Sequence, residues 1–141
     1  MAADPSDALQ AALVTALKGD PAVSAIIADR VYDQVPPGAV FPYLVIGDDQ
    51  VIADDLPDLP DGDEPLSQVF ARIHAWSRAT GFPEVKDLAG KVRNALRGAA
   101  LSLDGFRLDV RQHLQTRYLV DPDGLTRHAV VEFKFLVTHL T

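Results

Sequence analysis

Four histidines are the residues of this sequence best suited to acid–base or metal chemistry: His74, His113, His128 and His139. All four fall in segments that alternate as strands, and none has a second His or a Glu at the spacing of a zinc-binding helix. His113 and His128 could face each other across a hairpin. A small enzyme could then use one of them as a base beside Asp109 or Asp121.

Other catalytic signatures are missing from the sequence. It contains no cysteine, which excludes thiol nucleophiles, disulfides and zinc–thiolate sites. It also lacks a Gly-x-Ser-x-Gly elbow, a Walker loop and a Gly-x-Gly-x-x-Gly motif. The sequence therefore predicts no enzyme activity, no cofactor and no metal site.

Acidic residues account for the net charge of −7, and most of them gather in one segment. The segment holds eight acids and no Lys or Arg: Asp48, Asp49, Asp54, Asp55, Asp58, Asp61, Asp63 and Glu64. Its spacing does not match a calcium-binding EF-hand loop. We predict an acidic Asp/Pro-rich loop over 48–65, which is either a solvated loop or a contact for a basic partner. The rest of the chain is nearly neutral, so capture of nucleic acid by a general basic field is disfavoured.

Arginines mark the polar face expected for a strand over Phe106–Leu119. Arg107, Arg111 and Arg117 alternate there with Asp109, His113 and Gln115. One interpretation is an ordinary solvated sheet face. The other is a face that docks onto a carboxylate-rich surface of a neighbouring copy, in a head-to-tail contact that can close into a ring.

A second strand, over Gln68–Ser77, places Arg72, His74 and Trp76 on one side and apolar residues on the other. Trp76 is therefore either a core aromatic or an anchor of a subunit interface. Arg72 and Trp76 join the acidic residues and the three arginines as candidate interface residues.

The elements that must position these residues follow from capping signals and periodicity. Two long helices are predicted, one starting at Asp4-Pro5 and ending at Gly19, the other running from Pro83 to Gly98. Further segments are a short helical turn after Asp20-Pro21, an extended stretch over 30–33, strands over 41–46, 68–77 and 106–119, and a last strand containing Ala129–Val137. The last two strands form a hairpin across Asp121–Gly124. We predict an α+β fold with an antiparallel sheet of about four strands and two main helices on one face.

The length of 141 residues favours a single domain over 1–141. Apolar runs are too short or too broken to span a bilayer, so we do not expect a membrane protein. No secretory signal follows Met1.

The order of motifs resembles the tail-completion, or tail-terminator, family of long-tailed bacteriophages and related gene transfer agents. The resemblance covers most of the chain and depends on order and spacing. It is carried by Leu9, Leu13 and Leu17, then Arg30-Val31-Tyr32-Asp33 and Pro36, then Phe41-Pro42-Tyr43-Leu44-Val45-Ile46-Gly47, Ile73-His74-Ala75-Trp76-Ser77, the helix from Gly81 to Leu96, Asp123-Gly124 and Arg127–Phe133. The acidic insert at 54–65 is longer than the usual loop of that family.

The resemblance implies a structural virion protein with no catalytic residues. It implies a sixfold ring on the head-proximal end of the tail tube, assembled in the bacterial host cytoplasm. The implied partners are other copies of the chain, the tail tube protein and the head–tail connector, with DNA passing through the lumen without specific binding. The alternatives are a neck adaptor that does not end tube growth and a binding module that acts through the acidic loop.

Overall fold

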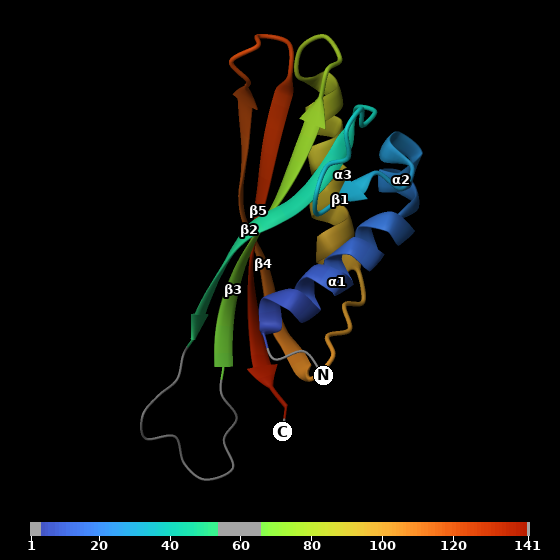
Figure 1. The fold of residues 1–141 in the computed structure, drawn as a ribbon. Helices are drawn as coiled ribbons and strands as arrows, with labels where there is room; N and C mark the ends of the chain where they lie inside the picture. Colours follow the sequence, from blue (N-terminus) through green and yellow to red (C-terminus); the bar gives the residue numbers. More distant parts are fainter. Residues whose placement is uncertain (1–3, 54–65, 141) are drawn as a thin grey trace.

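The chain folds as one sheet covered by helices in a computed structural model that describes residues 4–53 and 66–140 (Figure 1). The elements in order are α1 (Pro5–Gly19), α2 (Pro21–Ile27), β1 (Val31–Tyr32), β2 (Tyr43–Ala53), β3 (Leu66–Ser77), α3 (Pro83–Gly98), β4 (Phe106–Val120) and β5 (Arg127–His139). The strand order is β1-β2-β3-β5-β4. Strand β1 runs parallel to β2, and the other neighbours are antiparallel.

The α+β class is confirmed, but the predicted element count was too low. The described residues form five strands and three helices, where four strands and two main helices were expected. The extra strand is the two-residue β1, whose Val31 lies beside Leu44. The extra helix is α2, which was expected only as a turn. Both elements are short, so periodicity gives little signal for them.

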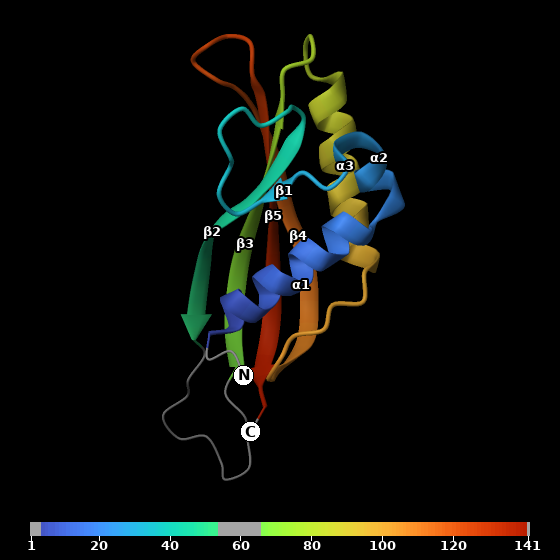
Figure 2. The same cartoon turned by 45° about the vertical axis from the view of Figure 1, so that its right-hand side comes forward.

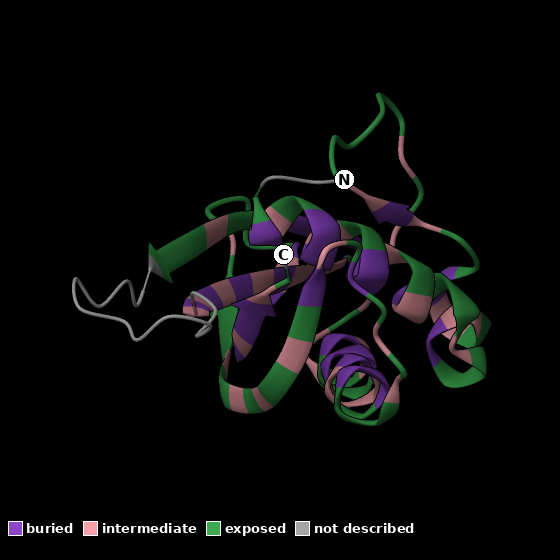
Figure 3. Cartoon of the chain, turned by 90° about the horizontal axis from the view of Figure 1, so that it is seen from below, coloured by how far each residue is buried: buried purple, intermediate pink, exposed green. Residues whose placement is uncertain are grey.

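The helices all lie on one face of the sheet, and the other face carries no helix of the described chain (Figures 1 and 2). The core fills the space between the helices and the sheet, and its interior appears as the buried residues in Figure 3. Its largest fully buried side chains are Phe133, Phe135, Leu9, Leu13, Leu17, Ile27, Leu44, Ile46, Ile73, Leu88, Leu96 and Val23. None of the described helices is long and apolar enough to cross a membrane.

The first two helices begin where the sequence predicts them. The Asp4 carboxylate accepts a hydrogen bond from the Ser6 amide at 2.8 Å, and Pro5 starts α1. Asp20 does the same for α2, accepting from the amides of Ala22 and Val23 at 3.0 Å. These bonds satisfy amides that have no partner inside the helix.

The β4–β5 hairpin is confirmed, with a turn held by Asp123. Its carboxylate accepts hydrogen bonds from the amides of Leu125 and Thr126, at 2.8 and 2.9 Å. These bonds and one from the Thr126 hydroxyl lower the pKa of Asp123 to about 2. Gly124 has a φ of 71°, a conformation that glycine adopts without strain.

The acidic loop predicted over 48–65 begins too early, because residues 48–53 belong to β2. The strand continues past Asp48 through a bulge between Gly47 and Gln50, where Asp48 has a φ of 46°. Beyond the bulge β2 stays paired with β3 as far as Ala53. Asp54, Asp55, Asp58 and Asp61 lie outside the described residues.

Candidate functional site

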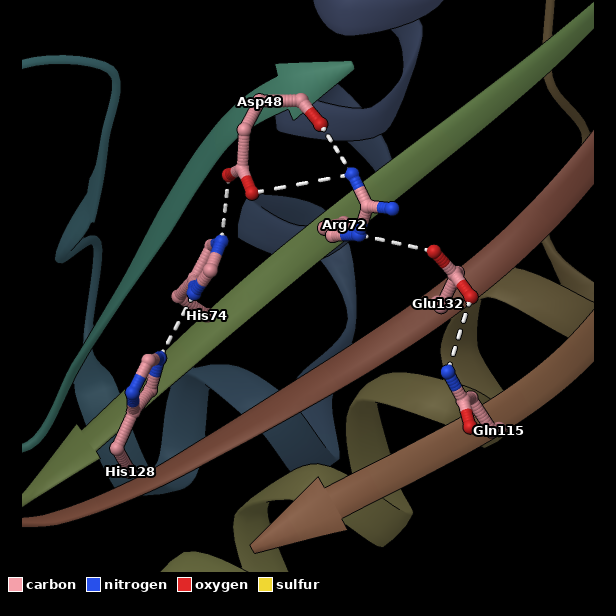
Figure 4. A network of polar contacts seen from close by, with 6 residues as sticks. All are labelled: Asp48, Arg72, His74, Gln115, His128 and Glu132. Carbon is pink, nitrogen blue, oxygen red and sulfur yellow. Dashed lines mark hydrogen bonds and ion pairs between the residues drawn. The ribbon is translucent and has the colours of Figure 1, made fainter. Parts of the chain in front are cut away.

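A chain of polar contacts crosses the open face of the sheet (Figure 4). At one end the Asp48 carboxylate on β2 lies 2.6 Å from Nε2 of His74 on β3. Nδ1 of His74 lies 2.7 Å from Nε2 of His128 on β5. These contacts tie three neighbouring strands together through their side chains.

A second branch of the same network continues to β4. The Arg72 guanidinium donates to the Asp48 carbonyl at 2.9 Å, and its Nε lies 2.8 Å from the Glu132 carboxylate. Glu132 in turn accepts from Gln115 at 3.2 Å. The Glu132 side chain is only 12% exposed, so its pairing with Arg72 compensates a charge that would be costly if left alone.

Trp76 belongs to this face, as its alternation with Arg72 and His74 predicts. It is half-buried, and its ring stacks on His128 with 3.7 Å between ring centroids and an angle of 10° between planes. Trp76 is therefore absent from the core cluster of buried residues. A role for it as an interface anchor remains a prediction.

The side chains of the network bond one another, so few of their polar atoms are free to contact a substrate. Both ring nitrogens of His74 are bonded within the network, so neither is free to bond a substrate. Burial lowers the pKa of His128, and neighbouring His74 lowers it further. Within the described residues no group of three or more His, Asp or Glu side chains is arranged to hold a metal ion.

The expectation that His113 faces His128 across the hairpin is wrong. In the β4–β5 register His113 lies opposite Phe133, and His128 lies opposite Leu119. His113 is on the helix side, where it bonds the Thr116 hydroxyl at 2.8 Å. The two histidines lie on opposite faces of the sheet, so they cannot share a catalytic site.

The expectation that Arg107, Arg111 and Arg117 share one face is also wrong. Bulges in β4 fall between Leu108 and Val110 and between His113 and Gln115. Each bulge adds a residue and reverses the alternation of side chains. Arg107 and Arg117 therefore lie on the open face, whereas Arg111 lies on the helix side.

Arg111 has a structural role at the end of α3. Its guanidinium donates to the carbonyls of Leu96 and Ala99, at 2.8 and 2.6 Å. The last carbonyls of a helix have no partner within it and carry partial negative charge. Arg111 thus joins the edge strand β4 to the C-terminal end of α3. On the open face, Arg107 bonds Asp109 at 2.7 Å and Thr138 at 3.2 Å.

Asp49 is the acidic residue that the bulge in β2 turns inward. It is half-buried, and its Oδ1 has no hydrogen-bond partner. Burial raises the pKa of this carboxyl, and the charge of Asp48 raises it further. The sequence named Asp49 as an interface candidate but did not show that it turns inward. It placed Gln115 on the polar face of its strand without a partner, and it did not single out Glu132. Placing these side chains requires the pairing of β3 with β5. These two strands are not joined by a turn, so no local sequence pattern indicates that they pair.

The fold and this face together define an α+β sheet protein whose polar side chains hold strands to one another. Comparison with known proteins makes this class specific: the model of the family described as Tail completion protein gp17 matches residues 11–138, and the chain belongs to that family. Its role is that of a structural phage tail protein, not of an enzyme.

Individual relatives agree with this assignment. The chain is 25% identical over 99 residues to the tail completion protein gp17 of Bacillus phage SPP1, covering 70% of this chain and 69% of the relative. It also resembles a chain in the solved structure of the virion of a native gene transfer agent particle. That likeness has a TM-score of 0.85 and 28% identity, and it covers 97% of this chain and 99% of the other.

Proposed function

We propose that this chain forms a ring, hexameric as the family resemblance implies, that caps the head-proximal end of a tail tube. The ring stops addition of tube subunits and offers a new surface to the head connector, with DNA passing through its lumen. The chain is thus a neck component of a phage-like particle. The observation that carries the proposal is the match along 97% of the chain to a component of a gene transfer agent virion.

The edges of the sheet support assembly into a ring. Strand β4 is an edge strand of 15 residues. It exposes five large apolar side chains: Val110, Leu114, Tyr118, Leu119 and Val120. Exposed apolar groups on an unpaired edge are typical of surfaces that another chain covers.

The opposite edge of the sheet is also partly open. Strand β1 covers β2 only at Leu44 and Val45, so the rest of β2 has no partner on that side among the described residues. A head-to-tail ring needs two different surfaces on each subunit. The two edges of this sheet are different surfaces and face away from each other.

Deletion of the coding sequence tests the capping role. We expect particles or lysates with tail tubes of widely varying and excessive length, because nothing then ends polymerisation. Tail lengths measured by negative-stain electron microscopy provide the readout, and expression of the chain from a plasmid is the control. Tubes of normal length in the deletion would contradict capping. Normal free tails beside tailless heads would instead identify a neck adaptor.

A further inference from the structure

Three cations of α3 lie along one side of the helix. Lys86, Arg93 and Arg97 are spaced by seven and four residues, which places them on a common helical face with Gly90 between the first two. Lys86 reaches toward β4, with its Nζ 5.3 Å from the centre of the Tyr118 ring. With Arg111 of β4, these residues form what we call the basic strip.

The charge of the basic strip is not neutralised by the described part of the chain, in which none of its four cations pairs with a carboxylate. Arg111 bonds only backbone carbonyls. Arg93 makes one long contact with the Asn94 side chain, at 3.4 Å, and its Nε is buried without a partner. The nearby His113 responds to this field, since Arg93 and Arg97 add to burial in lowering its pKa.

The segment that complements the strip is in the same sequence. Residues 54–64 contain six acids and no Lys or Arg: Asp54, Asp55, Asp58, Asp61, Asp63 and Glu64. The segment follows β2, which ends at the lower left of Figure 1 and lies near one edge of the sheet, whereas β4 is the strand at the opposite edge. In a head-to-tail contact the β2 side of one copy meets the β4 side of the next.

We propose that the basic strip of each subunit binds the acidic segment 54–64 of a neighbouring copy. The inference deepens the proposed function, because it rests on repeated copies arranged around a ring. Carboxylates suit arginine guanidinium groups, which donate two parallel hydrogen bonds. Duplex DNA is the weaker candidate, because the chain has 20 acids against 13 bases and no general basic field.

Disulfide trapping tests the contact, since the sequence contains no cysteine. Gly90→Cys places a thiol within the strip, where an added Cβ meets no atom within 4 Å. Gly62→Cys places the second thiol between two acids of the segment. The two full-length variants are purified separately, the thiol at position 62 is activated as a mixed disulfide, and the rate of disulfide formation between the chains is measured after mixing.

Gly19→Cys is the matched control, because it also adds a Cβ to open space but lies at the end of α1. Cations lower the pKa of a nearby thiol, so each thiol is first calibrated against a small uncharged disulfide. After this correction we expect position 90 to react about ten-fold faster than position 19, through electrostatic attraction and docking. The difference should vanish in about 1 M salt, where the Debye length is only about 3 Å.

Equal corrected rates at positions 90 and 19 would overturn the proposal. If duplex DNA also protected the thiol at position 90, the strip would be assigned to DNA instead. Rapid intramolecular bonding in a dilute chain carrying both cysteines would place the contact within one copy and overturn the inter-copy claim. The tail lengths of the deletion are independent of these results, so failure of this contact and failure of the capping role are distinguishable.

Discussion

At the scale of single residues, His128 on the open face is the side chain through which we expect stability to depend on pH. His128 stacks on Trp76 and bonds His74, whose other nitrogen is held by Asp48. Because Asp48 accepts from Nε2 of His74, Nδ1 of His74 is left to accept from His128 when both rings are neutral. A proton added to His128 therefore goes to its Nδ1, the nitrogen that does not bond His74, and the resulting cation lies in a partly buried environment beside a second histidine.

The lowered pKa of His128 makes stability depend on pH. The unfolded chain takes up this proton near the ordinary histidine pKa of about 6.5, before the folded chain does. The contribution of neutral His128 to the free energy of unfolding should thus be fully present above that pH. It should be lost as the pH drops towards the folded-state pKa. His128→Gln should reduce this dependence by no more than about 1.4 kcal/mol per pH unit, the limit for one proton.

Urea unfolding followed by fluorescence measures this effect, since Trp76 is the single tryptophan. His139→Gln is the control, because it leaves both histidines with lowered pKa values, His113 and His128, in place. An unchanged pH dependence in His128→Gln would show that folding does not favour the neutral form of His128.

At the scale of elements, the end of α3 depends on an arginine from another strand. Arg111→Ala should leave two helix-terminal carbonyls without their donor and lower the free energy of unfolding by about 1–3 kcal/mol. Arg117→Ala is the matched control on the same strand. Because this side chain is exposed, its loss should change the free energy of unfolding by no more than about 0.5 kcal/mol. Equal losses in urea unfolding would contradict the assigned role of Arg111.

The cap of α2 offers a second measurement at this scale. Asp20 holds the amides of Ala22 and Val23. Asp20→Ala should therefore lower the free energy of unfolding by about 1 kcal/mol, whereas Asp20→Asn should recover most of the loss. A similar loss in both variants would mean that the side chain acts by something other than capping.

Sequence reasoning succeeded where the signal was local. The caps at Asp4 and Asp20, the turn at Asp121–Gly124 and the alternation that groups Arg72 with Trp76 are all local patterns, and the structure confirms them. The failures have a shared physical cause. Bulges are not visible in an alternating sequence, and each bulge reverses every side chain that follows it.

Two errors followed from those bulges and one from strand pairing. Arg111 was grouped with Arg107, although the bulge near Asp109 turns it towards α3. The acidic loop was started at Asp48, although the bulge there lets β2 continue. His128 was matched with His113 because only the hairpin was considered, whereas its contact with His74 comes from β3 across the sheet.

At the scale of the whole molecule, the helix-covered sheet has one open face, an apolar edge at β4 and a basic strip beside it. These surfaces suit a chain that packs side by side with copies of itself. The interface roles of the acidic residues, Arg72, Trp76 and Arg107 remain predictions. Arg117, exposed on the open face, stays with them.

Neutralising the acidic segment tests its part in assembly. Replacing Asp54, Asp55, Asp58 and Asp61 with Asn should weaken contacts between copies, and we expect longer and more variable tails together with lower infectivity or transfer. Negative-stain tail lengths and particle titres check this. Asp29→Asn with Asp33→Asn is a control for loss of acidic charge elsewhere. Unchanged tail lengths and titres in the fourfold variant would show that the segment's charge serves only solubility.

The position of the chain in an assembled particle tests the capping ring most directly. A labelled copy should be found at one place in each particle, the junction between head and tail, as a ring one subunit thick around the DNA path. Electron microscopy of purified particles with a labelled chain gives this result. Label spread along the tube, confined to the distal tip or missing from particles would contradict the proposed ring.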